Sequence, residues 1–274
     1  MAIRKYQGVR FDALSTEKVG DVLSVEEALQ INVNGTPFTI TMRSPNNDEA
    51  LVRGLLHSEG VLNNVNYLPE IQLQKEKEDS IITIANLTIP EEQLGDGYSN
   101  GRNLLSVASC GICGKTELDD LGDLGAALPS SKTLDSHIIP ALFERMQAAQ
   151  NSFKQSGGSH AAAAFNTQGE LLACMEDIGR HNAVDKVIGD LILRGKSGET
   201  QTLLVSGRIS YEIVIKVFKA KIPVLCAVSA PSSLAVDYAK ELGVTLLAFC
   251  RGEHSTCYAH PERIQSTYQG QKAI

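Results

Sequence analysis

The stretch TLLVSGRISYEIVIKVFKAKIPVLCAV, residues 202–228, sets the fold class of this 274-residue chain. It opens with an apolar run, Thr202–Ser206, and closes with a second one, Pro223–Val228, and each run predicts a buried strand. About residues 210–220, between the two runs, are expected to form a helix. A strand, a helix and a strand in this order indicate parallel strands joined by a crossover.

The same alternation continues on both sides of this stretch. Three more strands are predicted, at Ala161–Phe165, Leu171–Met175 and Val244–Phe249. Three more helices are predicted, over about residues 134–150, 182–194 and 232–242. Continuous apolar strands separated by such helices predict a mixed, largely parallel sheet that helices cover on both faces. The C-terminal half is therefore expected to be a three-layer α/β domain.

The N-terminal half predicts a smaller α+β domain. Leu29–Val33 and Phe38–Met42 alternate apolar and polar residues, and Asn34-Gly35 between them is a strong hairpin signal. A helix is expected to open at Asn47 and to stop at Gly60. Two further strands are predicted near Ile71–Lys75 and Ile81–Asn86.

Two segments of this half show no regular pattern. Residues 1–20 lack clear periodicity and are expected to form an irregular lead-in. Residues 94–115 begin with closely spaced glycines and polar residues, which mark a loop. We place the domain boundary there, so the N-terminal domain covers residues 1–125 and the C-terminal domain covers residues 126–274.

The loop ends in a pair of cysteines, Cys110 and Cys113, each followed by a glycine. Glycine permits a tight backbone turn that leaves the two sulfurs unshielded. Thr116–Asp119 reads as a helix start, and its partial positive charge together with Lys115 favours thiolate over thiol. The stretch therefore predicts a nucleophilic thiolate in a mobile link.

Two other uses of this cysteine pair have to be weighed. A structural zinc site needs a second Cys or His pair at similar spacing, and the other four cysteines provide none. We therefore expect no metal site. A thioredoxin-like redox pair is the stronger competitor, because Cys-x-x-Cys is its motif.

Composition limits the kind of partner and the compartment. The net charge of −7 argues against general nucleic-acid binding, so local basic groups must hold any anionic ligand. No apolar run approaches the roughly 18 residues that would span a membrane, and no signal peptide is visible. Six scattered cysteines then indicate a reducing cytoplasm.

Basic residues follow the predicted strands, where ligands of such sheets bind. Arg180 and His181 come after the second strand of this domain, Arg208 after the next, and Arg251 and His254 after the last. Helix starts and cations are the parts of anion sites, so the set predicts a phosphate-bearing ligand. Taken singly, each junction also fits an ordinary helix cap. His160, after two glycines, equally fits a core position.

Five stretches match a known family in their residues. They are Ser109–Gly114, Gly157–Ala162, Glu176–Lys186, Ser206–Glu212 and Val228–Pro231. In them the chain resembles the formate dehydrogenase accessory sulfurtransferases, the FdhD/NarQ family, over about residues 25–260. It departs from the family pattern at Thr256-Cys257-Tyr258, where an extra thiol stands.

The resemblance implies a sulfur carrier. A cysteine desulfurase would load sulfur, and the chain would pass it to the molybdenum cofactor of formate dehydrogenase, a bis-molybdopterin guanine dinucleotide. Cys110 matches the persulfide-carrying cysteine, and Cys113 assists release or receives sulfur in turn. The family's cofactor stretch matches Phe249, Cys250, Arg251, Gly252, Glu253 and His254. The resemblance also implies a cytidine-deaminase-like C-terminal domain, and it leaves the oligomeric state, such as a homodimer, open.

Three rival functions are separated by particular residues. A zinc deaminase on such a fold needs a glutamate two places after its His and a later Pro-Cys-x-x-Cys. Here Ala162 stands two places after His160, so we reject deamination. A dithiol oxidoreductase leaves the basic sheet junctions unused. A chaperone that only binds cofactor predicts that Cys110 and Cys113 are dispensable.

Overall fold

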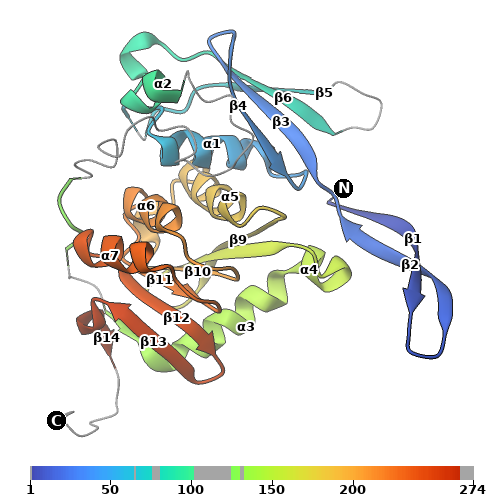
Figure 1. Ribbon diagram of the computed structural model, residues 1–274. Helices are drawn as coiled ribbons and strands as arrows, with labels where there is room; N and C mark the ends of the chain where they lie inside the picture. Colours follow the sequence, from blue (N-terminus) through green and yellow to red (C-terminus); the bar gives the residue numbers. More distant parts are fainter. Residues whose placement is uncertain (1, 65, 76–80, 102–124, 130–132, 266–274) are drawn as a thin grey trace, which may run out of the picture.

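The computed structural model describes residues 2–64, 66–75, 81–101, 125–129 and 133–265 (Figure 1). Their largest sheet has the strand order β13-β12-β11-β10-β8-β9. The strands are β8 (His160–Phe165), β9 (Leu171–Asp177), β10 (Thr202–Val205), β11 (Val224–Ala227), β12 (Thr245–Arg251) and β13 (His254–Ala259). Strands β10, β11 and β12 pair in parallel, while β8 and β13 are antiparallel to their neighbours. Because β8 is antiparallel to both β9 and β10, strand β9 points the same way as β10.

Helices cover both faces of this sheet, as the alternation of strands and helices predicted. One face packs against α5 (Arg180–Leu193), α6 (Tyr211–Lys219) and α7 (Ser233–Glu241). The other face packs against α3 (Ile139–Ala149), which α4 (Asn151–Ser156) follows (Figure 1). The predicted mixed α/β class is confirmed. Strand β13 was missed, and the likeness to cytidine deaminases stays a prediction.

A second sheet forms from the N-terminal half in the order β4-β3-β6-β5. Its strands are β3 (Glu27–Val33), β4 (Thr36–Arg43), β5 (Ile71–Lys75) and β6 (Ile82–Leu87), and α1 (Asp48–Glu59) packs on it. The chain also forms the short segments α2 (Asp96–Gly101), β7 (Leu134–Asp135) and β14 (Ile264–Gln265). The predicted hairpin turn is confirmed, since Asn34 and Gly35 have φ of 52° and 75°.

The interpretation of residues 1–20 as irregular was wrong. Strands β1 (Ile3–Phe11) and β2 (Thr16–Ser24) pair antiparallel and form a hairpin that projects from the rest of the molecule (Figure 1). Most residues of both strands are exposed on both faces. Since no face is buried, selection for one apolar face is absent, and the period-2 signal of a strand is lost.

The two halves of the chain meet where α1 packs against α5. A Cβ atom added at Gly54 of α1 would overlap the backbone oxygen of Asp185, and one at Gly189 of α5 would overlap that of Ala50. The helix backbones therefore touch, which requires glycine at both positions. The predicted boundary near residue 125 stays a prediction, because residues 102–124 lie outside the described part.

Candidate functional site

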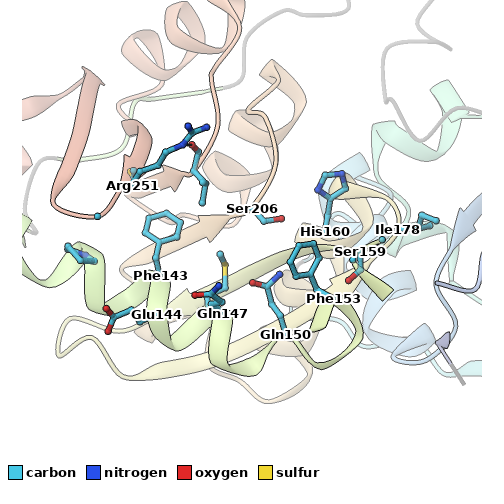
Figure 2. A pocket seen from close by; sticks show the side chains of 17 residues that line it. Phe143, Glu144, Gln147, Gln150, Phe153, Ser159, His160, Ile178, Ser206 and Arg251 are labelled. Carbon is cyan, nitrogen blue, oxygen red and sulfur yellow. Dashed lines mark hydrogen bonds between the residues drawn. The ribbon is translucent and has the colours of Figure 1, made fainter. Parts of the chain in front are cut away.

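A cavity of about 700 Å³ lies between α3 and one edge of the large sheet. Strands β9, β10, β11 and β12 end at this edge, and β8 begins there. The lining residues include Phe143, Glu144, Gln147, Gln150, Phe153, Ser159, His160, Ile178, Ser206, Cys250, Arg251 and Gly252. Figure 2 shows Phe143 and Phe153 rising from the helical side toward Arg251, Ser206 and His160. The helical side of the cavity thus combines the two aromatic rings with the polar side chains Glu144, Gln147 and Gln150.

His160 is the first residue of β8, opposite Asp177 of β9. Its pKa is lowered by burial and by the positive charges of Arg180 and Arg208, with Asp177 acting in the other direction. A Cβ atom at Gly207 would lie 3.2 Å from His160 Nδ1, so a glycine allows the loop after β10 to pass close to the ring. His160 is therefore a neutral imidazole in a positive surrounding.

His181 is buried at the start of α5 and does not line the cavity. Its Nε2 lies 2.9 Å from Ser210 Oγ and 3.8 Å from Glu212 Oε2, at the start of α6. Burial, Arg180, Lys216 and His160 lower the pKa of His181 to about 3. His181 therefore joins the starts of two helices as a neutral ring.

The arginines predicted at this edge differ in their surroundings. Arg208 is exposed, and Arg180 is half-buried with its Nε lacking a hydrogen-bond partner. Arg251 is exposed beside the cavity, and its Nε donates to the backbone oxygen of Val228 at 3.4 Å. Each guanidinium retains donor groups for an anion.

The predicted stretch 249–254 is only partly in the cavity. Cys250, Arg251 and Gly252 line it, while Phe249, Glu253 and His254 do not. Phe249 has φ of 53°, an unusual conformation for a bulky residue, and its ring centroid lies 6.4 Å from that of Tyr258. The irregularity comes from a bulge between Ala248 and Arg251 in the pairing with β13.

Glu176 organises the helical rim of the cavity, and the sequence analysis did not single out this role. Its carboxylate accepts the backbone N–H groups of Ser152 and Phe153 at 2.8 and 2.7 Å, at the start of α4. It also accepts the hydroxyl of Ser159 at 2.8 Å. These bonds fix two of the lining residues, Phe153 and Ser159. A carboxylate directly after the predicted strand Leu171–Met175 would have been the signal.

Cys110 and Cys113 lie outside the described residues, so their position relative to the cavity stays untested. Within the described ranges, no three His, Cys, Asp or Glu side chains come together in a way that could hold a metal ion. No helix in the same ranges is long and apolar enough to cross a membrane.

Comparison with known proteins gives one consistent family. The FdhD/NarQ family matches residues 24–265 of the chain. The sulfur carrier protein FdhD of Streptomyces avermitilis is 42% identical over 271 residues, which is 95% of this chain and 94% of that protein. The sulfur carrier protein FdhD of Saccharolobus solfataricus is 40% identical over 266 residues, 96% of this chain and 98% of that protein.

A solved structure shows the same fold. It is that of a candidate formate dehydrogenase accessory protein from Desulfotalea psychrophila, with a TM-score of 0.77 and 22% identity over 97% of this chain and 100% of that chain. At this identity the likeness concerns the fold alone. The sequence matches show that the chain belongs to the FdhD/NarQ family, as its motifs predicted.

Proposed function

We propose that this protein is a sulfur carrier that serves a formate dehydrogenase. It accepts sulfur from a cysteine desulfurase as a persulfide on Cys110 and delivers it to the bis-molybdopterin guanine dinucleotide form of the molybdenum cofactor. The relatives of about 40% identity are named sulfur carrier proteins, which supports the carrier role. The observation that supports binding of the cofactor is the cavity with positively charged side chains nearby.

The transfer needs a good leaving group at Cys110. The acceptor takes the outer sulfur of the persulfide, the sulfur–sulfur bond breaks, and Cys110 leaves as thiolate. The positive charge expected around the cysteine pair stabilises that thiolate, which favours its departure. Cys113 assists release or receives sulfur in turn.

The sulfur acceptor, the molybdenum cofactor, is a substrate of this protein. The cavity suits one of its guanine nucleotide groups. Its volume of about 700 Å³ is typical of sites for small molecules. Arg251 lines the cavity and presents a guanidinium group for phosphate, while Arg180 and Arg208, which are not among the lining residues, contribute positive charge near His160. Phe143 and Phe153 offer flat apolar surfaces for ring systems (Figure 2). A protein with net charge −7 needs such a local arrangement to hold a polyanion.

The remaining parts of the proposal follow from the sequence. Residues 1–125 and 126–274 form the two domains, the second resembles cytidine deaminases, and the protein works in the cytoplasm.

Two measurements test the proposed function. Guanosine diphosphate, used as a fragment of the cofactor, should raise the melting temperature more than adenosine diphosphate, and Arg251→Ala should reduce the shift. At 100 times its dissociation constant, a ligand stabilises the folded state by about 2.7 kcal/mol. Equal shifts with both nucleotides would leave only a generic anion site.

The second measurement concerns the thiol. After incubation with a desulfurase and cysteine, the peptide with Cys110 should gain the mass of one sulfur atom. The Cys110→Ala protein should neither take up this sulfur nor activate formate dehydrogenase. Full activation by that variant would instead favour a chaperone that only binds the cofactor.

A further inference from the structure

Three cysteines lie on neighbouring strands beside the cavity. Cys226 is on β11, Cys250 on β12 and Cys257 on β13, and all three belong to the layer between the sheet and α3. In the sheet register Cys226 lies opposite Leu247, which lies opposite Cys257. Cys250 is the one of the three that lines the cavity.

Cys250 reaches the cavity because β12 is irregular at Phe249. Leu247 faces the α3 layer and Ala248 faces the opposite layer, so regular alternation would turn Cys250 away from α3. The bulge between Ala248 and Arg251, with φ of 53° at Phe249, returns Cys250 to the α3 side. A bulge beside a cavity commonly re-aims a side chain in this way. The strain at Phe249 thus serves the placement of Cys250.

The pKa of Cys250 is shifted by its neighbours on β11. The parallel pairing of β11 with β12 ends at Cys226 and Leu247. The thiol of Cys226 and the backbone N–H of Ala227 both act on Cys250 Sγ as hydrogen-bond donors. These bonds lower the pKa of Cys250, against the effect of burial, and they raise that of Cys226, which keeps its proton. Hydrogen bonds to the charged form stabilise a thiolate.

The other described thiols near α3 have the opposite surroundings. Cys257 Sγ donates to the backbone oxygen of Ala259 at 3.2 Å, and burial raises its pKa despite an opposing effect of the backbone of Ala259. Cys174 donates to the backbone oxygen of Met146, and burial raises its pKa to about 11. Both are held as thiols, which are poor nucleophiles. Within the described residues, Cys250 is the thiol that is aimed into the cavity and supported as a thiolate.

We propose that Cys250 is a second sulfur-accepting nucleophile, which holds a persulfide inside the cavity with Cys226 as its positioning residue. The inference rests on the proposed function, since it requires that the protein meets a persulfide donor. The Cys250 thiolate attacks the outer sulfur of a donor persulfide, R–S–S–H. The donor's sulfur–sulfur bond breaks, the donor leaves as the thiolate R–S⁻, and a new bond forms between Cys250 Sγ and the transferred sulfur, which keeps its proton. No electrons are gained or lost overall.

This step would bring sulfur to the place where the acceptor binds. Arg251 and His160 line the same cavity as Cys250. Cys250 is only 5% exposed and lines the cavity, so small reactants reach a persulfide on it through the cavity. The cavity then combines a store of sulfur with the groups proposed to hold the acceptor.

The test uses full-length protein without the loop thiols, the Cys110→Ala/Cys113→Ala variant. It is incubated with glutathione persulfide, alkylated, digested and analysed by mass spectrometry. The peptide with Cys250 should carry one added sulfur atom, and the peptides with Cys174 and Cys257 should not. Cys250→Ser in the same background should lose the label, and Cys174→Ala, the matched control, should keep it. Reading the label on the unaltered Cys250 makes the result independent of whether the Cys250 variant folds.

Cys226 is tested through the alkylation rate of Cys250. Cys226→Ala should slow alkylation of Cys250 by about threefold to tenfold, since one hydrogen bond to the thiolate is lost. Cys226→Ser, which keeps a donor, should restore most of the rate, whereas a merely structural role would not distinguish the two variants.

The outcomes separate this inference from the proposed function. No label on Cys250, equal labels on Cys174 and Cys257, or a Cys226–Cys250 disulfide in place of the persulfide would overturn the inference, even if the wild-type protein still activates formate dehydrogenase. A labelled Cys250 in a wild-type protein that takes no sulfur on Cys110 from a desulfurase would instead contradict the proposed function.

Discussion

Replacing Lys216 by Met would leave a buried carboxylate without its cation. Lys216 Nζ of α6 lies 2.9 Å from both carboxylate oxygens of Asp185 on α5, and both side chains are buried. Ser58 of α1 donates its hydroxyl to the same carboxylate at 2.7 Å. Methionine matches the lysine stem in length but offers no donor. The substitution therefore perturbs a junction of three helices with little change in shape.

The expected loss of stability is large. Removing one partner of a buried ion pair typically costs about 3–5 kcal/mol. Since Ser58 still donates to Asp185, we expect the lower end, about 3 kcal/mol. For a chain of this size the melting temperature should fall by roughly 6–12 °C.

The loss should depend on pH with a definite sign. Burial raises the pKa of Asp185 above its usual value, while Lys216 and Ser58 act against this rise. Without Lys216 the folded-state pKa of Asp185 rises further above the unfolded value of about 3.9. Between these two values the folded state binds more protons than the unfolded state, so the stability of the variant falls as pH rises. The deficit relative to wild type should be smallest near the unfolded value and full above the folded one.

Urea unfolding of the wild-type and variant proteins at several pH values measures this deficit. Lys196→Met is the matched control, because Lys196 makes an exposed pair with Glu199 at 3.9 Å that should contribute at most about 1 kcal/mol. Adding Asp185→Asn to Lys216→Met should recover part of the loss, since the uncompensated charge is removed. A Lys216→Met protein that is no less stable than Lys196→Met, or whose deficit grows as pH falls, would refute the reasoning.

Three further predictions concern the helix contact and the cavity. Gly189→Ala should lower the free energy of unfolding in urea by about 1–3 kcal/mol, because the new methyl group overlaps the backbone of α1. Gly198→Ala, where an added Cβ meets no other atom, should leave this free energy nearly unchanged. Equal losses of stability in the two variants would contradict the close contact of the helices. Calorimetric titration with guanosine diphosphate should show tighter binding as pH falls from 8 to 6. The arginines near His160 lower its pKa, and a bound phosphate offsets their charge and so raises that pKa, which means that binding takes up a proton. A His160→Gln protein with the same pH dependence would show that another group is responsible. Glu176→Gln should reduce stability by about 1 kcal/mol, since a charged acceptor at the start of α4 is lost, and an unchanged urea midpoint would speak against that role.

The sheet and the basic residues that follow its strands could be predicted because their signals are local and strong. The apolar runs around residues 202–228 give strands that are buried on both faces, and the turns after them carry the basic residues. The direction of β8 was not readable from these runs, although it brings His160 to the same edge as the ends of the other strands. Strand direction depends on pairing partners that are distant in sequence, so local patterns do not encode it.

Other features depended on tertiary contacts that no short stretch reveals. His181 stands beside Arg180 in the sequence, yet the helical turn directs it into the interior toward Ser210. Cys250 faces α3 because of a bulge that includes the unusual φ of Phe249. The β1–β2 hairpin was missed because it buries neither face.

The touching backbones of α1 and α5 also have a mechanical consequence. Two helices that are separated by side chains can shift relative to each other, whereas at Gly54 and Gly189 no side chain separates the two backbones. A hinge at this contact would have to separate peptide groups and expose the ion pair of Lys216 and Asp185 to water. The two halves that meet there should therefore move as one rigid body, and a binding partner would contact a fixed surface rather than two domains that close around it.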